Sequence, residues 1–374
     1  RVDVRWLTFI RPAARNAVTS GIDERLAEIC KTMPTFGPVK AVVINGAGGK
    51  AFAAGTDMTQ FRAFESEEDA LKYEGQIDAV LDASGFALGD SWETRWVEGA
   101  AKTFAFWRNQ NKKVILLPQA FGPFERPQVR QAARRALLSA DLIFARDSDS
   151  HDHVSNLVPH HAGVYRAPDF TNLVDVARTR HLQRGGRLAI IVPNSQMLKH
   201  GPAEARSRYV DFMTKCAEHL LVRGLEPSIV LHEERSDNEL AEQISQSISG
   251  GLPIVRESCP LVLKGLIGQS SITIGSRFHG LVNALSQGIP SIGTSWSHKY
   301  RYLFEDYGRP HWLVDSLDET ERCLNLIDGI LNNREDESAH LRAMSNGLKE
   351  KSEEMWTIVE EFLASGQTFK NAKL

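Results

Sequence analysis

The sequence predicts an α/β protein built from doubly wound parallel sheets. Short apolar strands alternate with helices from about residue 110 onward, which is typical of parallel sheets with helices on both faces. The predicted strands cover residues 114–117, 142–145, 187–192, 228–232, 253–255, 271–275 and 290–294. The predicted helices cover residues 127–140, 202–222, 236–248, 260–268, 279–287 and 297–306, and a long polar helix covers about 335–365.

The first part of the chain follows a less regular pattern. Strands are predicted at 4–10 and 40–44, with a helix from about 20 to 33 between them and another over 67–81. A stretch rich in proline, glycine and charge over 158–186 marks a domain boundary before the strand at 187–192.

Length and composition exclude several classes of protein. A chain of 374 residues suggests two or three domains, and its 42% hydrophobic and 24% charged residues are ordinary for a globular protein. No apolar run reaches the roughly 18 residues of a membrane-spanning helix. The net charge of −3 gives no basic excess for nucleic acid. The four cysteines lie far apart without a CxxC pair, which fits a reducing compartment and predicts a cytoplasmic protein.

Arg277 and His279 are the leading candidates for catalysis. They follow the predicted strand 271–275, at the carboxyl end of a parallel strand, where open α/β sheets bind ligands. The guanidinium of Arg277 suits a carboxylate or phosphate, and the imidazole of His279 can transfer a proton. The alternative is that the two side chains cap a helix and bond the adjacent domain.

A second group of candidates follows the strand 290–294. His298 and Lys299 could contact a phosphate or an acceptor, and Trp296 could stack on a sugar ring. The alternative is a serine that caps the next helix, with Lys299 in solvent.

Gln119 and Arg146 follow two further predicted strands. Gln119 could bond an acceptor hydroxyl, because the turn at 122–123 lets the backbone approach a ligand; a plain strand-to-helix connection is the alternative. Arg146 opens the run RDSDSHDH (146–153), which looks like a metal site, but helix caps also recruit Asp and Ser. We expect Arg146 to bind an anion, and we expect no metal.

Residues 11–62 resemble the enoyl-CoA hydratase (crotonase) family. The resemblance rests on the words RPAARNA (11–17) and GGKAFAAGTDM (48–58). In that family the second word supplies one backbone N–H group of an oxyanion hole, and Ala54 matches that position. The family's second N–H donor and its acidic catalytic residues do not follow after residue 83.

Residues from about 78 to 315 resemble the polysaccharide pyruvyl transferases. The resemblance rests on the words DASGF (82–86), PQAFGPF (118–124), ADLIFARD (140–147), VPN (192–194) and GSRFHG (275–280). It implies a two-domain, GT-B-like architecture and the transfer of the enolpyruvyl unit of phosphoenolpyruvate onto two sugar hydroxyls. Ser276 lies in the last word and is a substrate-binding candidate. No metal or cofactor is implied.

The two resemblances meet near residues 77–83 and predict a chimera. Pyruvyl transferases begin with a strand and a Gly-Asn-x-Gly-Asp turn that this sequence lacks, so the first domain is expected to be incomplete. The predicted parts are a crotonase-like fragment (1–77), a partial first Rossmann-like domain (78–170), a second Rossmann-like domain (171–340) and a C-terminal helix (341–374).

Taken together, these features predict a pyruvyl transferase that uses phosphoenolpyruvate as donor. The expected acceptor is a sugar of a surface polysaccharide or its lipid-linked precursor. Arg277 would hold the carboxylate or phosphate, His279 would act as acid or base, and Lys299 would assist phosphate departure. The expected location is the cytoplasm or the inner face of the membrane. Two alternatives stay open: a CoA-thioester protein of the enoyl-CoA hydratase/isomerase type, and a chimera without turnover.

Overall fold

The computed structural model describes residues 3–9, 25, 28, 39–46, 79–174, 176, 186–200, 203–295, 299–314 and 316–365. The chain divides into two compact units, Arg1–Asp78 and Ala79–Leu374. In the first unit, β1 (Asp3–Phe9) and β2 (Val39–Gly46) pair in parallel, which confirms the two strands predicted there. Most of the helices predicted at 20–33 and 67–81 falls outside the described residues.

Residues 79–81 form a strand, although the sequence analysis placed the end of a helix there. Strand β3 (Ala79–Asp82) pairs in parallel with β4 (Lys113–Gln119), so that Val80 lies opposite Val114. An apolar run this short fits a helix or a strand equally well, and the buried neighbouring strand decides between them.

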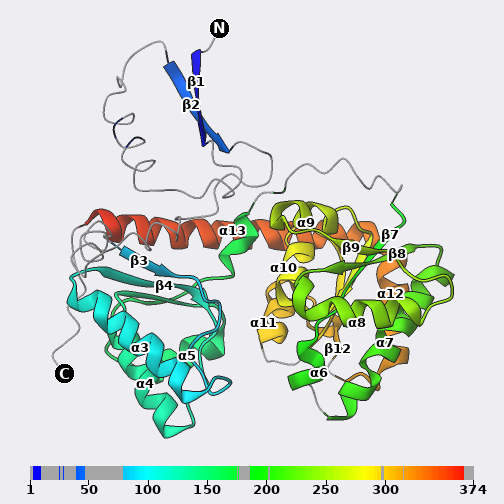
Figure 1. Cartoon of the computed structure of the whole chain (residues 1–374), viewed down its shortest axis with the longest axis horizontal. Coiled ribbons are helices and arrows are strands. Elements are labelled where there is room, and N and C mark those ends of the chain that lie inside the picture. The colour runs from blue at the N-terminus through cyan, green and yellow to red at the C-terminus, as the bar shows by residue number, and fades with distance from the viewer. Residues whose placement is uncertain are drawn as a thin grey trace, which may run out of the picture. The chain divides into compact units, whose positions relative to one another are not determined.

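The second unit contains a four-stranded parallel sheet in the order β3-β4-β5-β6, with β5 at Leu142–Ala145 and β6 at Val164–Arg166 (Figure 1). One face packs against α3 (Thr94–Asn109), α4 (Pro127–Ser139) and α5 (Ser148–Leu157). The other face packs against the end of α13 (Arg334–Ala364), where Met355, Val359 and Phe362 contact the strands. Helices therefore cover both faces, as predicted.

A six-stranded parallel sheet follows in the same unit, in the order β12-β11-β10-β7-β8-β9. Its strands are β7 (Leu188–Val192), β8 (Glu226–Leu231), β9 (Ile254–Arg256), β10 (Ile272–Gly275), β11 (Ser291–Thr294) and β12 (Leu313–Val314). The helices are α6 (Gln196–His200), α7 (Ala203–Val222), α8 (Glu234–Gln246), α9 (Pro260–Ile267), α10 (Phe278–Leu285), α11 (Lys299–Asp306) and α12 (Thr320–Asn332). Short 3-10 helices lie at Phe170–Leu173 (η3) and Pro310–Trp312 (η4).

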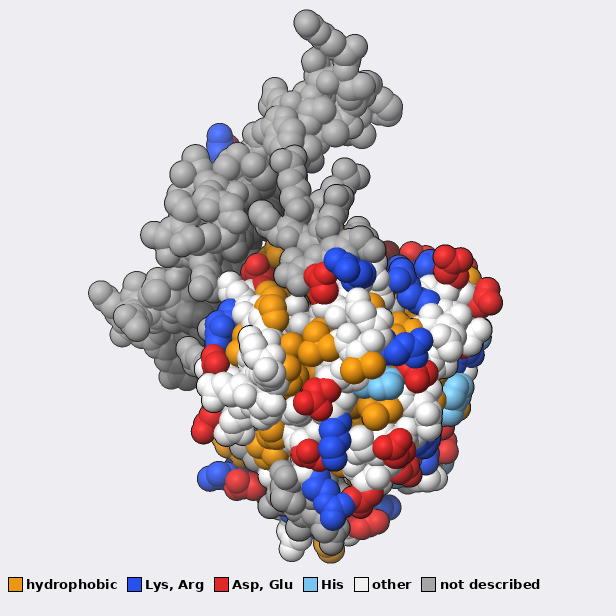
Figure 2. Space-filling view, turned by 90° about the vertical axis from the view of Figure 1, so that its right-hand side faces the viewer, with side chains coloured by type: hydrophobic (Ala, Val, Ile, Leu, Met, Phe, Trp, Pro, Cys, Tyr) orange, Lys and Arg blue, Asp and Glu red, His pale blue; other side chains and the backbone are white. Residues whose placement is uncertain are grey.

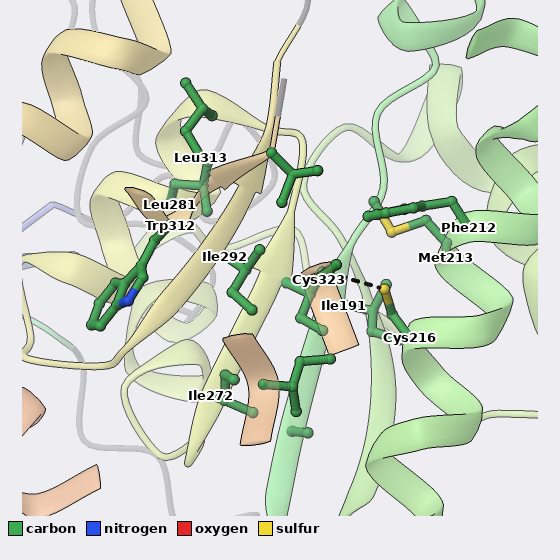
Figure 3. Close-up of a cluster of buried hydrophobic side chains, with 14 of the residues drawn as sticks. Ile191, Phe212, Met213, Cys216, Ile272, Leu281, Ile292, Trp312, Leu313 and Cys323 are labelled. Atoms are coloured by element: carbon green, nitrogen blue, oxygen red, sulfur yellow. Dashed lines mark hydrogen bonds between the residues drawn. The ribbon is translucent and has the colours of Figure 1, made fainter. Parts of the chain in front are cut away.

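The largest core cluster lies in this second sheet region, between its strands and helices such as α7 and α12 (Figure 3). Cys216 of α7 and Cys323 of α12 meet there, with their sulfur atoms 3.6 Å apart. Both are free thiols, and their mutual hydrogen bond together with burial raises the pKa of the Cys216 thiol. These cysteines therefore pack as apolar side chains.

The surface carries charges of both signs side by side. On the face in Figure 2, basic and acidic side chains are interspersed with hydrophobic ones, and neither sign forms a broad patch. This mixture agrees with the small net charge of −3. None of the helices in the described ranges is long and apolar enough to cross a membrane.

Candidate active site

His279 lies beside a buried carboxylate. It sits in the first turn of α10, directly after β10, and Asp169 follows β6 of the four-stranded sheet. Nε2 of His279 is 3.6 Å from Oδ2 of Asp169; the His279 side chain is 48% exposed and that of Asp169 is 11% exposed. A half-exposed imidazole against a buried carboxylate is an arrangement suited to acid–base chemistry.

Arg146 joins this pair from the carboxyl end of β5. Its Nη1 lies 3.1 Å from Oδ2 of Asp169, and its guanidinium stacks 4.4 Å from the ring centre of Phe278. The side chain is only 7% exposed, and within the described part of the chain its Nη2 has no hydrogen-bond partner. A buried guanidinium nitrogen without a protein acceptor is suited to an anionic ligand.

The negative charge of Asp169 is stabilised by its neighbours. Burial alone would raise its pKa, but the close contact with His279, the charge of Arg146 and the hydrogen bonds from Thr171 hold the pKa well below its usual value. Thr171 donates its backbone N–H at 3.1 Å and its hydroxyl at 2.6 Å to Oδ1. Asp169 therefore remains ionised at neutral pH and can orient the His279 ring.

Arg277 is held by a carboxylate of helix α8. Its Nε donates to Oδ2 of Asp237 at 2.8 Å, and its Nη2 donates to Oδ1 of Asp237 at 2.7 Å and to Oγ of Ser236 at 2.8 Å. Asp237 is fully buried and also accepts the N–H of Ser195. Two nitrogens of Arg277, Nε and Nη2, are thus held in place by Asp237 and Ser236.

His232 stacks on His279 and was not recognised in the sequence analysis. The two rings are 6.3 Å apart and inclined by 17°. His232 follows β8 directly, so it also lies at the carboxyl end of a parallel strand. Burial, followed by the positive charges of His279 and Arg277, lowers the pKa of His232 to about 4. His232 is therefore neutral at neutral pH, next to the ring that contacts Asp169.

Ser276 supports the turn before α10 and does not face a ligand. It is fully buried, and its hydroxyl bonds Tyr209 at 2.6 Å and also Thr294. Its carbonyl accepts hydrogen bonds from Asn194 and Tyr300, both at 2.7 Å. The expected substrate contact is therefore replaced by a structural role, because the side chain points into the interior and links strand ends.

Gln119 is also fully buried at the end of β4. Its Nε2 donates to Oδ2 of Asp82 at 2.9 Å, while its Oε1 is buried without a partner among the described residues. At Gly122 the close approach is made by a protein side chain, because an added Cβ would lie 2.5 Å from Nδ1 of His153. The turn thus packs against α5. It has the form of the strand-to-helix connection that the sequence analysis gave as the alternative to a ligand contact.

The acidic run after Arg146 caps a helix. Asp147 precedes α5 and accepts the backbone N–H of Ser150 at 2.7 Å. Asp149 lies 3.6 Å from Arg301 of α11. Within the described ranges, no three His, Cys, Asp or Glu side chains are grouped to hold a metal ion. The run therefore serves as a helix cap and as a contact with α11.

Four further candidates cannot be placed. Ala54, Trp296 and His298 lie outside the described residues, and only the backbone of Lys299, at the start of α11, is described. Their predicted roles stay predictions.

Asp169 and His232 are the site residues that sequence reasoning missed. Each follows a parallel strand, and that position is the signal that points to a site at a sheet edge. β6 has only three residues and was not predicted, so Asp169 was not recognised. The sequence analysis predicted a strand over 228–232 and so counted His232 as part of it, whereas the strand ends at Leu231.

The two parallel sheets and the side chains gathered at their carboxyl ends define a GT-B-like α/β protein. The family model described as polysaccharide pyruvyl transferase matches residues 8–298, well over half of the sequence. The chain therefore belongs to the polysaccharide pyruvyl transferase family, a family of transferases. The matched range includes most of the segment whose resemblance to crotonases stays a prediction. Comparison with curated proteins gives no match.

Two solved UDP-N-acetylglucosamine 2-epimerase structures, one of them putative, have a similar fold. A putative UDP-N-acetylglucosamine 2-epimerase from Listeria monocytogenes has a TM-score of 0.56 at 12% identity, and the alignment covers 99% of each chain. UDP-GlcNAc 2-epimerase from Neisseria meningitidis, bound to UDP-GlcNAc, has a TM-score of 0.51 at 12% identity, covering 97% of this chain and 100% of that one. At these identities the likeness concerns the fold alone.

Proposed function

We propose that the chain transfers the pyruvyl unit of phosphoenolpyruvate to two hydroxyls of a sugar, in a surface polysaccharide or its lipid-linked precursor. Family membership supports transferase chemistry. The observation that carries the proposal is the contact between His279 and Asp169, flanked by Arg146 and Arg277. One acid–base side chain and two guanidinium groups suit a donor that carries both a carboxylate and a phosphate.

The proposed reaction begins with proton transfer from His279 to the methylene carbon of phosphoenolpyruvate. The first sugar hydroxyl attacks the resulting oxocarbenium-like carbon and gives up its proton. The bond between that carbon and the phosphate oxygen then breaks, and inorganic phosphate leaves with one proton. The second hydroxyl closes the ketal and releases its proton. The two hydroxyl protons balance those gained by the methyl group and the phosphate.

The residues at the site divide these tasks. Arg277, oriented by Asp237, would bind the carboxylate or phosphate, and Nη2 of Arg146 would provide a second donor. His279, deprotonated by the first step, would accept the proton of the attacking hydroxyl, and the neutral ring of His232 stacks beside it. Lys299 would assist phosphate departure.

The test is turnover with phosphoenolpyruvate and a panel of free hexoses and UDP-hexoses. Phosphate release and the mass of the ketal product are the two readouts. We expect His279→Gln to lower kcat at least roughly 100-fold with little change in phosphoenolpyruvate affinity. His160→Gln, which changes an exposed histidine away from the site, is the matched control. Full turnover in His279→Gln would contradict the assignment.

A further inference from the structure

A cavity opens beside Arg146. It has a volume of about 270 Å³ and opens between the ends of β5 and β6, the end of α11 and the middle of α13. The polar residues that line it include Arg146, Tyr165, Arg166, Asp306, Lys351 and Glu354. Of the active-site residues named above, only Arg146 also lines this cavity. The volume is close to the roughly 300 Å³ at which pockets for small molecules begin.

Two cationic side chains, Arg166 and Lys351, line this cavity. Arg166 and Lys351 are both exposed, and in the described part of the chain neither makes an ion pair. Both act on Asp306 only from a distance, through their charge. Because Arg offers a planar fork and Lys a compact ammonium, the two together suit a phosphate group.

Two carboxyl groups line the same cavity. Asp306 is partly buried, and Glu354 is exposed. Neither has a hydrogen bond or an ion pair within the described ranges, although both can accept hydrogen bonds from hydroxyl groups. Their negative charge also disfavours a bare phosphate ion. The site should therefore prefer a phosphate that carries hydroxyls over the phosphate alone.

The remaining wall is apolar and aromatic. Tyr165 stacks on Phe144, with ring centres 5.6 Å apart and planes inclined by 27°. Leu348, Met355 and Ile358 of α13 continue this surface. A partly exposed tyrosine ring beside aliphatic side chains suits the C–H face of a sugar ring, with polar groups at its edges.

We propose that this cavity binds a small phosphorylated sugar. The phosphate contacts Arg166 and Lys351, the hydroxyls contact Asp306 and Glu354, and the ring lies on Tyr165. This site adjoins the donor site at Arg146, but the ligand contacts proposed for it use other residues and do not depend on pyruvyl transfer.

Calorimetric titration with glucose 1-phosphate tests the proposal on the whole chain. We expect saturable binding that weakens at least tenfold in Arg166→Gln and in Lys351→Gln, both surface changes that leave the fold intact. Lys349→Gln, which makes the same change on α13 outside this cavity, should bind as the unchanged chain does. Asp306→Asn should weaken binding of glucose 1-phosphate and leave that of inorganic phosphate unchanged or tighter.

Other ligands distinguish this site from the donor site. Phosphoenolpyruvate affinity should be unchanged in Lys351→Gln, so a failed donor site and a failed sugar-phosphate site give different results. No binding of glucose 1-phosphate by the folded chain would overturn the proposal. Equal affinity for inorganic phosphate and glucose 1-phosphate would also overturn it, as would phosphoenolpyruvate binding that is lost in Lys351→Gln.

Discussion

Arg277 and Asp237 form a two-point ion pair, with Nε–Oδ2 at 2.8 Å and Nη2–Oδ1 at 2.7 Å. The carboxylate is fully buried, and the guanidinium is 18% exposed. This pair fixes the direction of Arg277 before any ligand arrives. Binding at Arg277 therefore requires little reorganisation, which is how an enzyme positions charge effectively.

The pair also predicts a large difference between two arginine substitutions. Arg277→Ala leaves the buried charge of Asp237 without its partner, so we expect a loss of about 3–5 kcal/mol in the free energy of unfolding. Arg256→Ala removes an exposed pair with Glu242 and should cost less than about 1 kcal/mol. Urea unfolding of both variants measures this. Equal losses would show that the Arg277–Asp237 pair is not buried in solution.

His232 predicts a loss of stability in mild acid. Its pKa is lowered from 6.5 to about 4, so the unfolded chain takes up its proton first as the pH falls. The stability is present above the unfolded pKa and is lost as the pH drops toward the folded one. Between pH 7 and pH 5 the titration of His232 should lower the free energy of unfolding by about 2 kcal/mol. In His232→Gln that share of the pH dependence should disappear from urea-unfolding energies, and an unchanged pH dependence would contradict the burial of His232.

Asp306 predicts the opposite dependence of stability on pH. Burial raises its pKa from 3.8 to about 6, against the charges of Arg166 and Lys351, so the folded chain holds the proton more tightly. Its contribution is complete below the unfolded pKa and is lost as the pH rises through the folded pKa. The unchanged chain should therefore lose about 2 kcal/mol of unfolding free energy through this group between pH 4 and pH 7. Asp306→Asn should not show this loss. Unfolding energies at the two pH values decide it: a variant that loses as much as the unchanged chain would show that Asp306 is solvated.

Two glycines predict opposite effects of the same substitution. Gly280 lies in α10, and an added Cβ would be 3.0 Å from Cγ1 of Val192, so Gly280→Ala should cost about 1–2 kcal/mol through overpacking. Gly99 lies on the exposed side of α3 with open space around it, so Gly99→Ala should gain up to about 1 kcal/mol from helix propensity. Thermal unfolding compares the two variants. A gain at both positions would mean that α10 does not press against β7.

The sequence predicted the strands that lie in the buried centres of the sheets. Strands such as β7 and β5 are continuous apolar runs, because a strand that is buried on both faces needs apolar side chains at every position. α3 was missed because Trp96 and Phe106 are exposed on it, so its apolar residues do not follow one face. β6 and β12 are too short to show a repeating pattern of apolar residues.

The site was predictable only in part. Arg277, His279 and Arg146 follow predicted strands, so their position at a sheet edge could be inferred. The contact of His279 with Asp169 joins residues of different sheets, and no spacing along the chain encodes it. Burial of Ser276 and Gln119 was likewise decided by packing, since a polar residue after a strand can face either a ligand or the core.

Calorimetric titration with phosphoenolpyruvate tests the donor site most directly. Three chains are compared: the unchanged chain, Arg277→Lys, which keeps a charge beside Asp237, and Arg256→Lys as the matched control. We expect saturable binding that weakens at least tenfold in Arg277→Lys, because a lysine cannot bind Asp237 and a ligand in the same fork geometry. The control should bind as the unchanged chain does. Absence of binding in the folded chain, or equal affinity in Arg277→Lys, would contradict a donor site at Arg277.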